Sequence, residues 1–299
     1  MDKSFFEEQV RHLRIAMFHQ TNTTKLLLGK QLSWSVKTRN IDQLTDAEFS
    51  VFSQFGDDGI IQYIISKVDI NQEKFIEFGV ENYIESNTRF LLENNNWSGM
   101  VIDSNKNNIE YIKNSLNYWR YDLKVMCSFV TAENINNLIQ DAGFEEDIGL
   151  LHIDIDGNDY WLWKAITVVK PVIVIVEYNS LFGVDRSITI PYNPDFSRFN
   201  KHYSGLYAGA SLKALCHLAS EKGYKFIGTN SAGNNAYFII LEQADKFTSL
   251  TCEEGYTLAK FREHRNEQGE LTFTSGLDAI EEIRGMPVFN TLTKQLEDF

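Results

Sequence analysis

Cysteine is scarce in this sequence, and long apolar runs are missing from it. The three cysteines, Cys127, Cys216 and Cys252, lie far apart and form no CxxC pair. This spacing excludes a disulfide framework and a thiolate zinc site. The longest apolar run, VVKPVIVIVEY, is interrupted by lysine and proline and is too short to span a bilayer. The N-terminus has mixed charges and no signal-peptide core. We therefore expect a soluble, cytoplasmic protein.

Positive charge is also in short supply. The chain has 28 Lys and Arg against 41 Asp and Glu, a formal net charge of −13. Such a balance argues against unspecific binding to nucleic acid or to an anionic membrane, although a small anionic ligand could still be held locally. With 299 residues the chain is long enough for one large α/β domain with extensions, or for two small domains.

The central part of the chain alternates between strand-like and helix-like segments. Five apolar runs read as buried strands, and helical spacing follows the first four: KFIEFGV, WSGMVIDSN, DLKVMCSFV, LLHIDID and PVIVIVEYN. Short connections between such segments imply a parallel sheet that is covered on both faces. After a further helix, YKFIGTNSAGNNAYFIILE reads as two adjacent strands, which should pair antiparallel.

These patterns predict an α/β fold, with a doubly wound, Rossmann-like sheet of seven mostly parallel strands and an antiparallel last strand. Residues 1–50 have helical apolar spacing and are expected to form a helical N-terminal extension. Residues 51–243 would form the main domain. Residues 244–299 would form a C-terminal extension, and both extensions are candidates for contacts within a homo-oligomer.

The first two strands carry a pattern that suits a nucleotide-like ligand. Glu77 and Gly79 end the first strand, and Asp103 ends the second, 24 residues after the glycine. Ligands of doubly wound sheets bind outside the carboxyl ends of the strands, where a carboxylate can accept both hydroxyls of a ribose. No GxGxxG motif is present, which argues against a pyrophosphate cradle. The alternative is a simple strand-turn-helix in which Asp103 caps the following helix.

Polar residues also gather where the fourth and fifth strands end. LLHIDIDGNDY brings Asp154 and Asp156, and PVIVIVEYNSLFG brings Glu177 and Asn179. Carboxylates placed together at one sheet edge repel each other unless a cation or a proton lies between them.

The glycine turn, the second-strand acid and the final strand pair resemble the class I S-adenosylmethionine-dependent methyltransferases, including the FkbM-like group that methylates sugars and polyketides. The resemblance covers about residues 52–242, which it makes the methyltransferase domain. It implies that the first loop holds the methionine part of the donor, the second-strand acid the ribose, and the region after the third strand the adenine. The donor-binding residues implied by position are Glu77, Gly79, Asp103, Ser104, Ser128, Phe129 and Asp154.

A narrower resemblance links IDIDGNDY to the VDADKxNY-type signature of divalent-metal-dependent O-methyltransferases, and EYNSLFG to their DNxLxxG stretch. It implies that Asp154, Glu177 and Asn179 bind Mg, Mn or Fe(II), a set of oxygen ligands that suits these ions. The sequence departs from that signature at Gly157, where the family often has a lysine base. The alternative reading makes Asp154 and Asp156 helix caps or donor contacts.

The general base is the least defined part of the pattern. His202 lies in a long irregular stretch after the fifth strand, where acceptor pockets are often built, and is a candidate base. Asp156 is the fallback. His152 shares a strand face with Asp154 and could support the metal ligands or be a hydrogen-bonded core histidine.

The expected function is methyl transfer from S-adenosylmethionine to oxygen, with a divalent metal, on a sugar hydroxyl of a capsule, O-antigen or nucleotide-linked sugar. Sugar as acceptor follows from the resemblance alone. The alternatives are a nucleoside or nucleotide-sugar binding module, a metal-free methyltransferase with His202 or Asp156 as base, and an inactive scaffold that serves in interactions.

Overall fold

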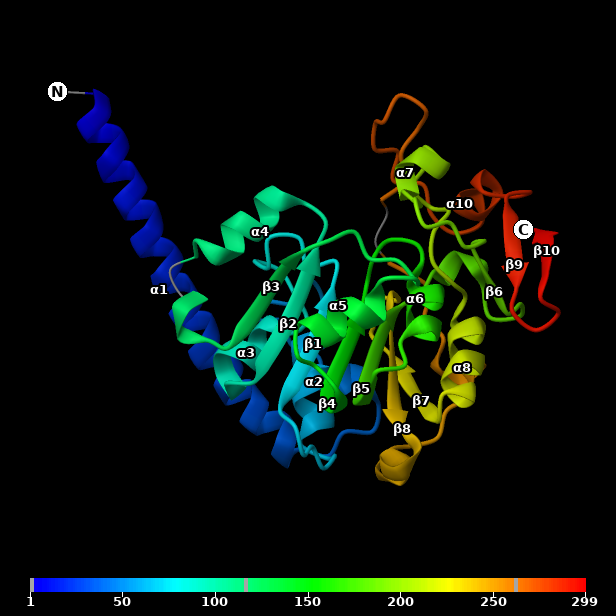
Figure 1. Cartoon of the computed structure of the whole chain (residues 1–299), viewed down its shortest axis with the longest axis horizontal. Helices are drawn as coiled ribbons and strands as arrows, with labels where there is room; N and C mark the ends of the chain where they lie inside the picture. Colours follow the sequence, from blue (N-terminus) through cyan, green and yellow to red (C-terminus); the bar gives the residue numbers. More distant parts are fainter. Residues whose placement is uncertain (1–2, 116–117, 261–262) are drawn as a thin grey trace.

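A seven-stranded sheet organises the chain (Figure 1). The structure is a computed structural model that describes residues 3–115, 118–260 and 263–299. The sheet has the order β3-β2-β1-β4-β5-β8-β7, and β8 alone is antiparallel to its neighbours, so the predicted fold class is confirmed. The strands are β1 (Lys74–Phe78), β2 (Ser98–Asp103), β3 (Leu123–Cys127), β4 (Glu146–Ile153), β5 (Val169–Glu177), β7 (Tyr224–Thr229) and β8 (Asn235–Ile240).

Both faces of the sheet are buried, which explains why its central strands are almost continuously apolar. One face packs on α2 (Asp57–Ile65), α3 (Arg89–Asn95) and α4 (Lys106–Lys113). The other face packs on α5 (Ile135–Asp141), α6 (Asp159–Ala165) and α8 (Leu212–Glu221). Alternate residues of one strand serve the two cores, as with Phe75 and Ile76 of β1, and each such side chain contributes about 1.5–3 kcal/mol by burial.

The direction of β8 decides which of its residues reach the edge where the parallel strands end. The parallel strands all finish at one edge of the sheet, and the antiparallel β8 begins there. Glu177, the last residue of β5, is therefore paired with Asn235, the first residue of β8. All seven strands thus have one end at the same edge.

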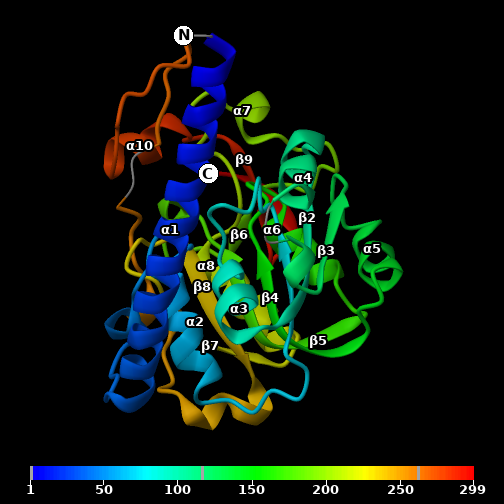
Figure 2. The ribbon, with the colours of Figure 1, turned by 90° about the vertical axis from the view of Figure 1, so that its left-hand side faces the viewer.

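The N-terminal extension is the long helix α1 (Lys3–Thr38), followed by η1 (Leu44–Ala47); residues 1–2 of the expected extension lie outside the described residues. Gly29 permits close packing, because a Cβ there would lie 2.5 Å from Val51 and 2.8 Å from Phe90. The N-terminal end of α1 extends beyond the body (Figures 1 and 2). Leu13 and Met17 on it are exposed. Among the described helices, none is both long and apolar enough to cross a membrane.

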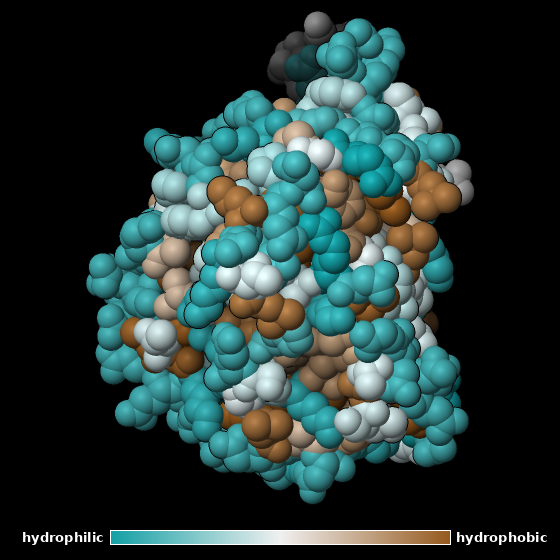
Figure 3. All heavy atoms as spheres, turned by 90° about the vertical axis from the view of Figure 1, so that its right-hand side faces the viewer, coloured by the Kyte–Doolittle hydropathy of each residue, from teal (hydrophilic) through white to brown (hydrophobic). Residues whose placement is uncertain are grey.

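The C-terminal segment folds back onto the chain that follows β5. A second sheet has the order β10-β9-β6, and Arg186 in that chain pairs with Glu297 at 2.8 Å. Figure 3 looks onto this side and shows separate apolar patches among hydrophilic side chains. The remaining elements are η2 (Tyr118–Arg120), η3 (Ser180–Phe182), β6 (Ile188–Thr189), α7 (Arg198–Lys201), η4 (Leu241–Lys246), α9 (Cys252–Gly255), α10 (Leu277–Glu282), β9 (Pro287–Asn290) and β10 (Gln295–Asp298).

Candidate active site

The largest hollow near the polar strand ends has a volume of about 770 Å³, within the range of small-molecule sites. Its wall is built by the carboxyl ends of β1 to β5, by the start of β8, and by Arg198 of α7. Glu263, Leu271 and Phe273 from the C-terminal segment complete it. The extension that follows residue 244 therefore contributes to this cavity.

Gly79 lies where the loop after β1 meets the end of β4 in this cavity. Its φ of +74° lies in the left-handed region, and a Cβ would stand 1.7 Å from the carbonyl oxygen of Asp154. A side chain is therefore excluded on conformational and steric grounds. The glycine lets the loop after β1 lie directly against the end of β4, so the expected donor loop and the carboxylate cluster are in contact.

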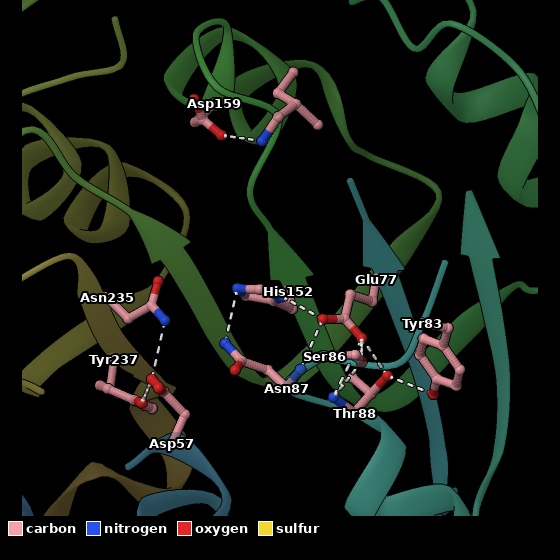
Figure 4. A network of polar contacts seen from close by, with 11 residues as sticks. Asp57, Glu77, Tyr83, Ser86, Asn87, Thr88, His152, Asp159, Asn235 and Tyr237 are labelled. Atoms are coloured by element: carbon pink, nitrogen blue, oxygen red, sulfur yellow. Dashed lines mark hydrogen bonds and ion pairs between the residues drawn. The ribbon is translucent and has the colours of Figure 1, made fainter. Parts of the chain in front are cut away.

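Glu77 is buried and fully partnered (Figure 4). Its carboxylate accepts hydrogen bonds from Ser86 Oγ at 2.6 Å, from Asn87 N at 3.0 Å and from Thr88 N at 3.2 Å. The Thr88 hydroxyl and His152 Nδ1, at 2.9 Å, complete the set. Burial alone raises the pKa of Glu77, but the hydrogen bond and charge of His152 and the two hydroxyls outweigh it, so the pKa lies below its usual value. Glu77 holds the loop of residues 80–88 against the sheet.

His152 bridges this loop and the cavity wall. Its Nδ1 faces Glu77, and its Nε2 lies 3.1 Å from the side-chain nitrogen of Asn87. Burial lowers the pKa of His152, but the hydrogen bond and charge of Glu77, with the charges of Asp154 and Asp57, together outweigh it, so the pKa lies above its usual value. The side chain is thus a hydrogen-bonded, buried histidine that also lines the cavity.

Asp103 connects the first two strands. Its carboxylate accepts from the backbone N–H of Glu81 at 2.9 Å and of Asn105 at 2.7 Å, and from the side chain of Asn108 at 3.2 Å. The N-cap of α4 is Asn105, whose side chain accepts from Asn107 N. The alternative in which Asp103 itself caps this helix is therefore wrong. The cavity wall includes Gly79, Asp103, Ser104, Ser128 and Phe129.

Three carboxylates crowd together at the ends of β4 and β5. Asp154, Asp159 and Glu177 each offer one oxygen, and these oxygens lie within 4.8 Å of one another. Asp159 was not predicted as a member of this cluster, because it begins a helix. Its carboxylate also accepts from Ile155 N at 2.8 Å and from Gly157 N at 2.9 Å. The loop after β4 thus turns this acid back toward the strand end.

The electrostatics of this cluster are unfavourable without a counter-charge. Burial, followed by repulsion from Asp156, raises the pKa of Asp154 to about 6. Burial and the charge of Asp154 raise the pKa of Asp159 to about 7. Burial and the same charge raise the pKa of Glu177 well above its usual range. The cluster must therefore share a proton or hold a cation.

Asn179 lies beside the cluster, with its amide occupied by the backbone. Its nitrogen donates to the carbonyl oxygens of Leu206 at 2.8 Å and Ala208 at 2.9 Å, and its oxygen accepts from Leu181 N at 3.0 Å. It caps η3 and lines a separate, smaller hollow. The third member of the cluster is therefore Asp159, from the IDIDGNDY stretch, and not the amide of Asn179.

The two candidate bases differ in position. Asp156 lines the cavity, and its carboxylate is paired with Arg198, which also binds Glu263 at 2.7 Å. His202 is not one of the described residues of the cavity wall; its ring stacks on Tyr203 and its Nδ1 contacts Ser204 Oγ at 2.7 Å.

The structure explains the departure at Gly157. A Cβ on this residue would stand 2.3 Å from the ring of Phe196, which lines the cavity. The place where related signatures have a lysine is covered by an aromatic ring, so a side chain has no room there.

A further group at this edge was not predicted. Asp57, at the start of α2, is buried and accepts from Asn230 Nδ2 at 3.1 Å, from Asn235 Nδ2 at 2.9 Å and from the hydroxyl of Tyr237 (Figure 4). The sequence did contain one signal for this group. The last strand was expected to be antiparallel, and an antiparallel strand starts at the edge where the parallel strands end. The polar stretch GNNAY therefore had to lie at the ligand edge.

Neither the protein-family models nor the curated proteins contain a match to this chain. Solved structures with a similar arrangement include an O-methyltransferase from Bacillus cereus in complex with SAH, at 12% identity and a TM-score of 0.36, covering 56% of this chain and 72% of that one. Another is an S-adenosylmethionine-dependent methyltransferase from Clostridium acetobutylicum, at 10% identity and a TM-score of 0.40, covering 62% and 90%. These likenesses concern the fold.

Proposed function

We propose that this protein is an S-adenosylmethionine-dependent O-methyltransferase, assisted by a divalent metal, that acts on a sugar hydroxyl. One observation carries the proposal. A single cavity at the carboxyl edge is lined by the glycine turn and second-strand acid of a donor site and, in backbone contact with that turn, by Asp154 and Glu177, two of the three crowded carboxylates. Such proximity is needed when a donor methyl and an acceptor oxygen must meet in line.

In this proposal the donor lies along the ends of β1, β2 and β3. Gly79 leaves room for the methionine part, and Glu77 shapes the facing loop through its hydrogen bonds. Asp103 receives the ribose hydroxyls with Ser104 beside it, and Ser128 and Phe129 flank the adenine. The cationic sulfonium of the donor is suited to an acidic wall.

The carboxylate cluster fits a hard divalent cation such as Mg, Mn or Fe(II). Asp154, Asp159 and Glu177 supply oxygen ligands of the kind that such ions prefer, and a cation removes the repulsion between them. Asn179, at the edge of the site, is a further proposed ligand of the cation. A bound cation would lower the pKa of an acceptor hydroxyl and orient it.

In the transfer, the hydroxyl oxygen forms a bond to the methyl carbon while the carbon–sulfur bond breaks and its electron pair stays on sulfur. The hydroxyl proton must leave to a base. Asp156, which lines the cavity, is the first candidate once the substrate displaces Arg198. His202 serves in this role only if the chain around it turns toward the cavity.

We also propose that the terminal extension α1 supports a homo-oligomer formed with a second copy of this chain. Its outward side exposes Leu13, Met17 and Leu28. Light scattering of the wild type and of Met17→Glu distinguishes a dimer from a monomer.

Calorimetric titration with S-adenosylhomocysteine tests the donor site. We expect one ligand per chain, and no binding at millimolar ligand would sink the methyltransferase proposal. The rival, a nucleoside or nucleotide-sugar binding module, would bind uridine diphosphate sugars in its place. Activity that survives exhaustive chelation and Asp154→Ala would favour the metal-free variant.

A further inference from the structure

Two buried asparagines in the cavity wall each have an oxygen without a partner. Among the described residues, five buried side-chain polar atoms lack a hydrogen-bond partner. Two of these atoms belong to residues that line the main cavity, and both are amide oxygens: Asn158 Oδ1 and Asn235 Oδ1. Asn158 is 5% exposed and Asn235 is 3% exposed. Buried polar atoms of this kind are normally satisfied, which points to a missing hydrogen-bond donor.

The orientation of Asn235 is fixed by its neighbours. Its nitrogen donates to Asp57 Oδ1 at 2.9 Å, and Asn230 and Tyr237 donate to the same oxygen. Because a carboxylate oxygen that collects three donors acts as an acceptor, the amide must turn its nitrogen toward Asp57. The amide oxygen of Asn235 consequently points away from Asp57, toward the end of the sheet (Figure 4).

Asn158 is oriented in the same way. Its nitrogen donates to the carbonyl oxygen of Asn193 at 2.8 Å, so its oxygen faces the other way. Both residues are neighbours of members of the carboxylate cluster. Asn235 is the cross-strand partner of Glu177, which places both side chains on one face of the sheet, and Asn158 directly precedes Asp159 in the chain.

The remaining wall supplies many acceptors and few unengaged donors. Among its described residues, the basic side chains are Arg198, held by Asp156 and Glu263, and His152, held by Glu77 and Asn87. The carboxylates in the wall are those of Asp57, Glu77, Glu81, Glu85, Asp103, Asp154, Asp156, Glu177 and Glu263. An anionic group entering here would meet like charge, whereas hydroxyl and ammonium groups would meet free acceptors.

We propose that Asn235 and Asn158 are substrate-recognition residues. Their oxygens accept hydrogen bonds from hydroxyl or ammonium groups on both sides of the reacting hydroxyl. The acceptor is thus a neutral or amino sugar unit without phosphate or carboxylate on the reacting ring. This inference rests on the proposed methyl transfer and narrows its substrate class, with Asp57 as the residue that positions Asn235.

Ligand-observed NMR on the complex with S-adenosylhomocysteine tests the proposal with four probes. The probes are methyl α-D-glucopyranoside, D-glucosamine, D-glucose 6-phosphate and D-glucuronate. We expect the first two to bind and the two anions to bind at least tenfold more weakly. Asn235→Ala and Asn158→Ala should each weaken glucosamine binding about three- to tenfold, the worth of one hydrogen bond.

The matched control is Asn136→Ala. Asn136 lies outside the cavity wall, and both ends of its amide are engaged, by Ala165 O at 2.8 Å and Thr167 N at 2.9 Å. This variant should bind the probes like the wild type, and all three variants should keep the wild-type affinity for S-adenosylhomocysteine. If Asn235→Ala fails to fold, Asn158→Ala carries the test.

Three outcomes would overturn the recognition roles: anions that bind as well as glucosamine, asparagine variants that bind like the control, or no binding of either non-anionic probe. Failure of the methyltransferase proposal is seen separately, as absent binding of S-adenosylhomocysteine. The probe titrations repeated on the free protein would still decide the sugar class.

Discussion

Two groups of carboxylates lie at the same sheet edge, and their surroundings are opposite. Glu77 receives hydrogen bonds from five donors of the chain, and its pKa is lowered. Asp154 and Glu177 face other carboxylates, and their pKa values are raised. The chain itself satisfies the first acid and leaves the second group in need of a shared proton or a cation. We infer that Glu77 stabilises the fold and that the cluster serves function.

The largest effect should come from the glycine that joins the two groups. Gly79→Ala introduces a Cβ 1.7 Å from the carbonyl oxygen of Asp154. We expect a loss of about 4 kcal/mol in the free energy of unfolding, because strain at positive φ adds to the clash. Urea unfolding measures it.

Gly223→Ala is the control for that variant, since Gly223, which follows α8, also has a positive φ, +80°, with nothing within 4 Å of the added Cβ. It should cost only about 1 kcal/mol. Equal costs for the two variants would contradict the close contact between the β1 loop and β4.

The second-largest effect on the unfolding free energy should come from removing the charge of Glu77. Glu77→Gln places an amide NH₂ against hydrogen-bond donors and leaves His152 without its carboxylate. The expected loss in unfolding free energy is about 3 kcal/mol. The comparison variant is Glu110→Gln, whose exposed pair with Lys106 at 3.7 Å should be worth less than about 0.5 kcal/mol.

The same substitution in the carboxylate cluster should change the unfolding free energy in the opposite direction. In metal-free protein, Glu177→Gln removes one of the mutually repelling charges, so we expect a gain of about 1 kcal/mol in unfolding free energy. Denaturation in the presence of a chelator is the measurement. A loss as large as that of Glu77→Gln would show that Glu177 is held by the chain like Glu77, and the contrast would disappear.

The smallest effect is a difference in pH dependence. A carboxyl whose pKa is raised on folding, such as Asp154 at about 6 and Asp159 at about 7, holds its proton more tightly in the folded state. Its contribution to the stability of the metal-free protein is therefore present at low pH and is lost as the pH rises from about 4 to 7. Unfolding midpoints at pH 5 and pH 7.5 should show this fall, and added manganese should reverse it at the higher pH.

The fold was predictable because its signals are local. Strand runs such as PVIVIVEY, helix spacing and the absence of a helix between the last two strands together predict a mostly parallel sheet with an antiparallel last strand. Asp103, Asp154 and Glu177 were found in the cavity wall because parallel strands must end at one edge.

The rest of the site depends on contacts that the local sequence does not encode. Asp159 joins the cluster because the loop after β4 turns it back through hydrogen bonds to Ile155 and Gly157. Asp57 comes from a helix far away in sequence and meets Asn235 only in the folded chain. Phe196 over Gly157 is likewise a tertiary contact, and it explains the missing lysine.

Titration of manganese into the protein by calorimetry tests the central claim most directly. We expect one ion per chain, with binding abolished by Asp154→Asn and by Glu177→Gln and retained in Glu77→Gln. Affinity should fall as the pH drops below about 7, because protons compete for the raised-pKa cluster carboxylates. Absence of manganese and magnesium binding at millimolar concentration, or equal loss in Glu77→Gln and Glu177→Gln, would contradict it.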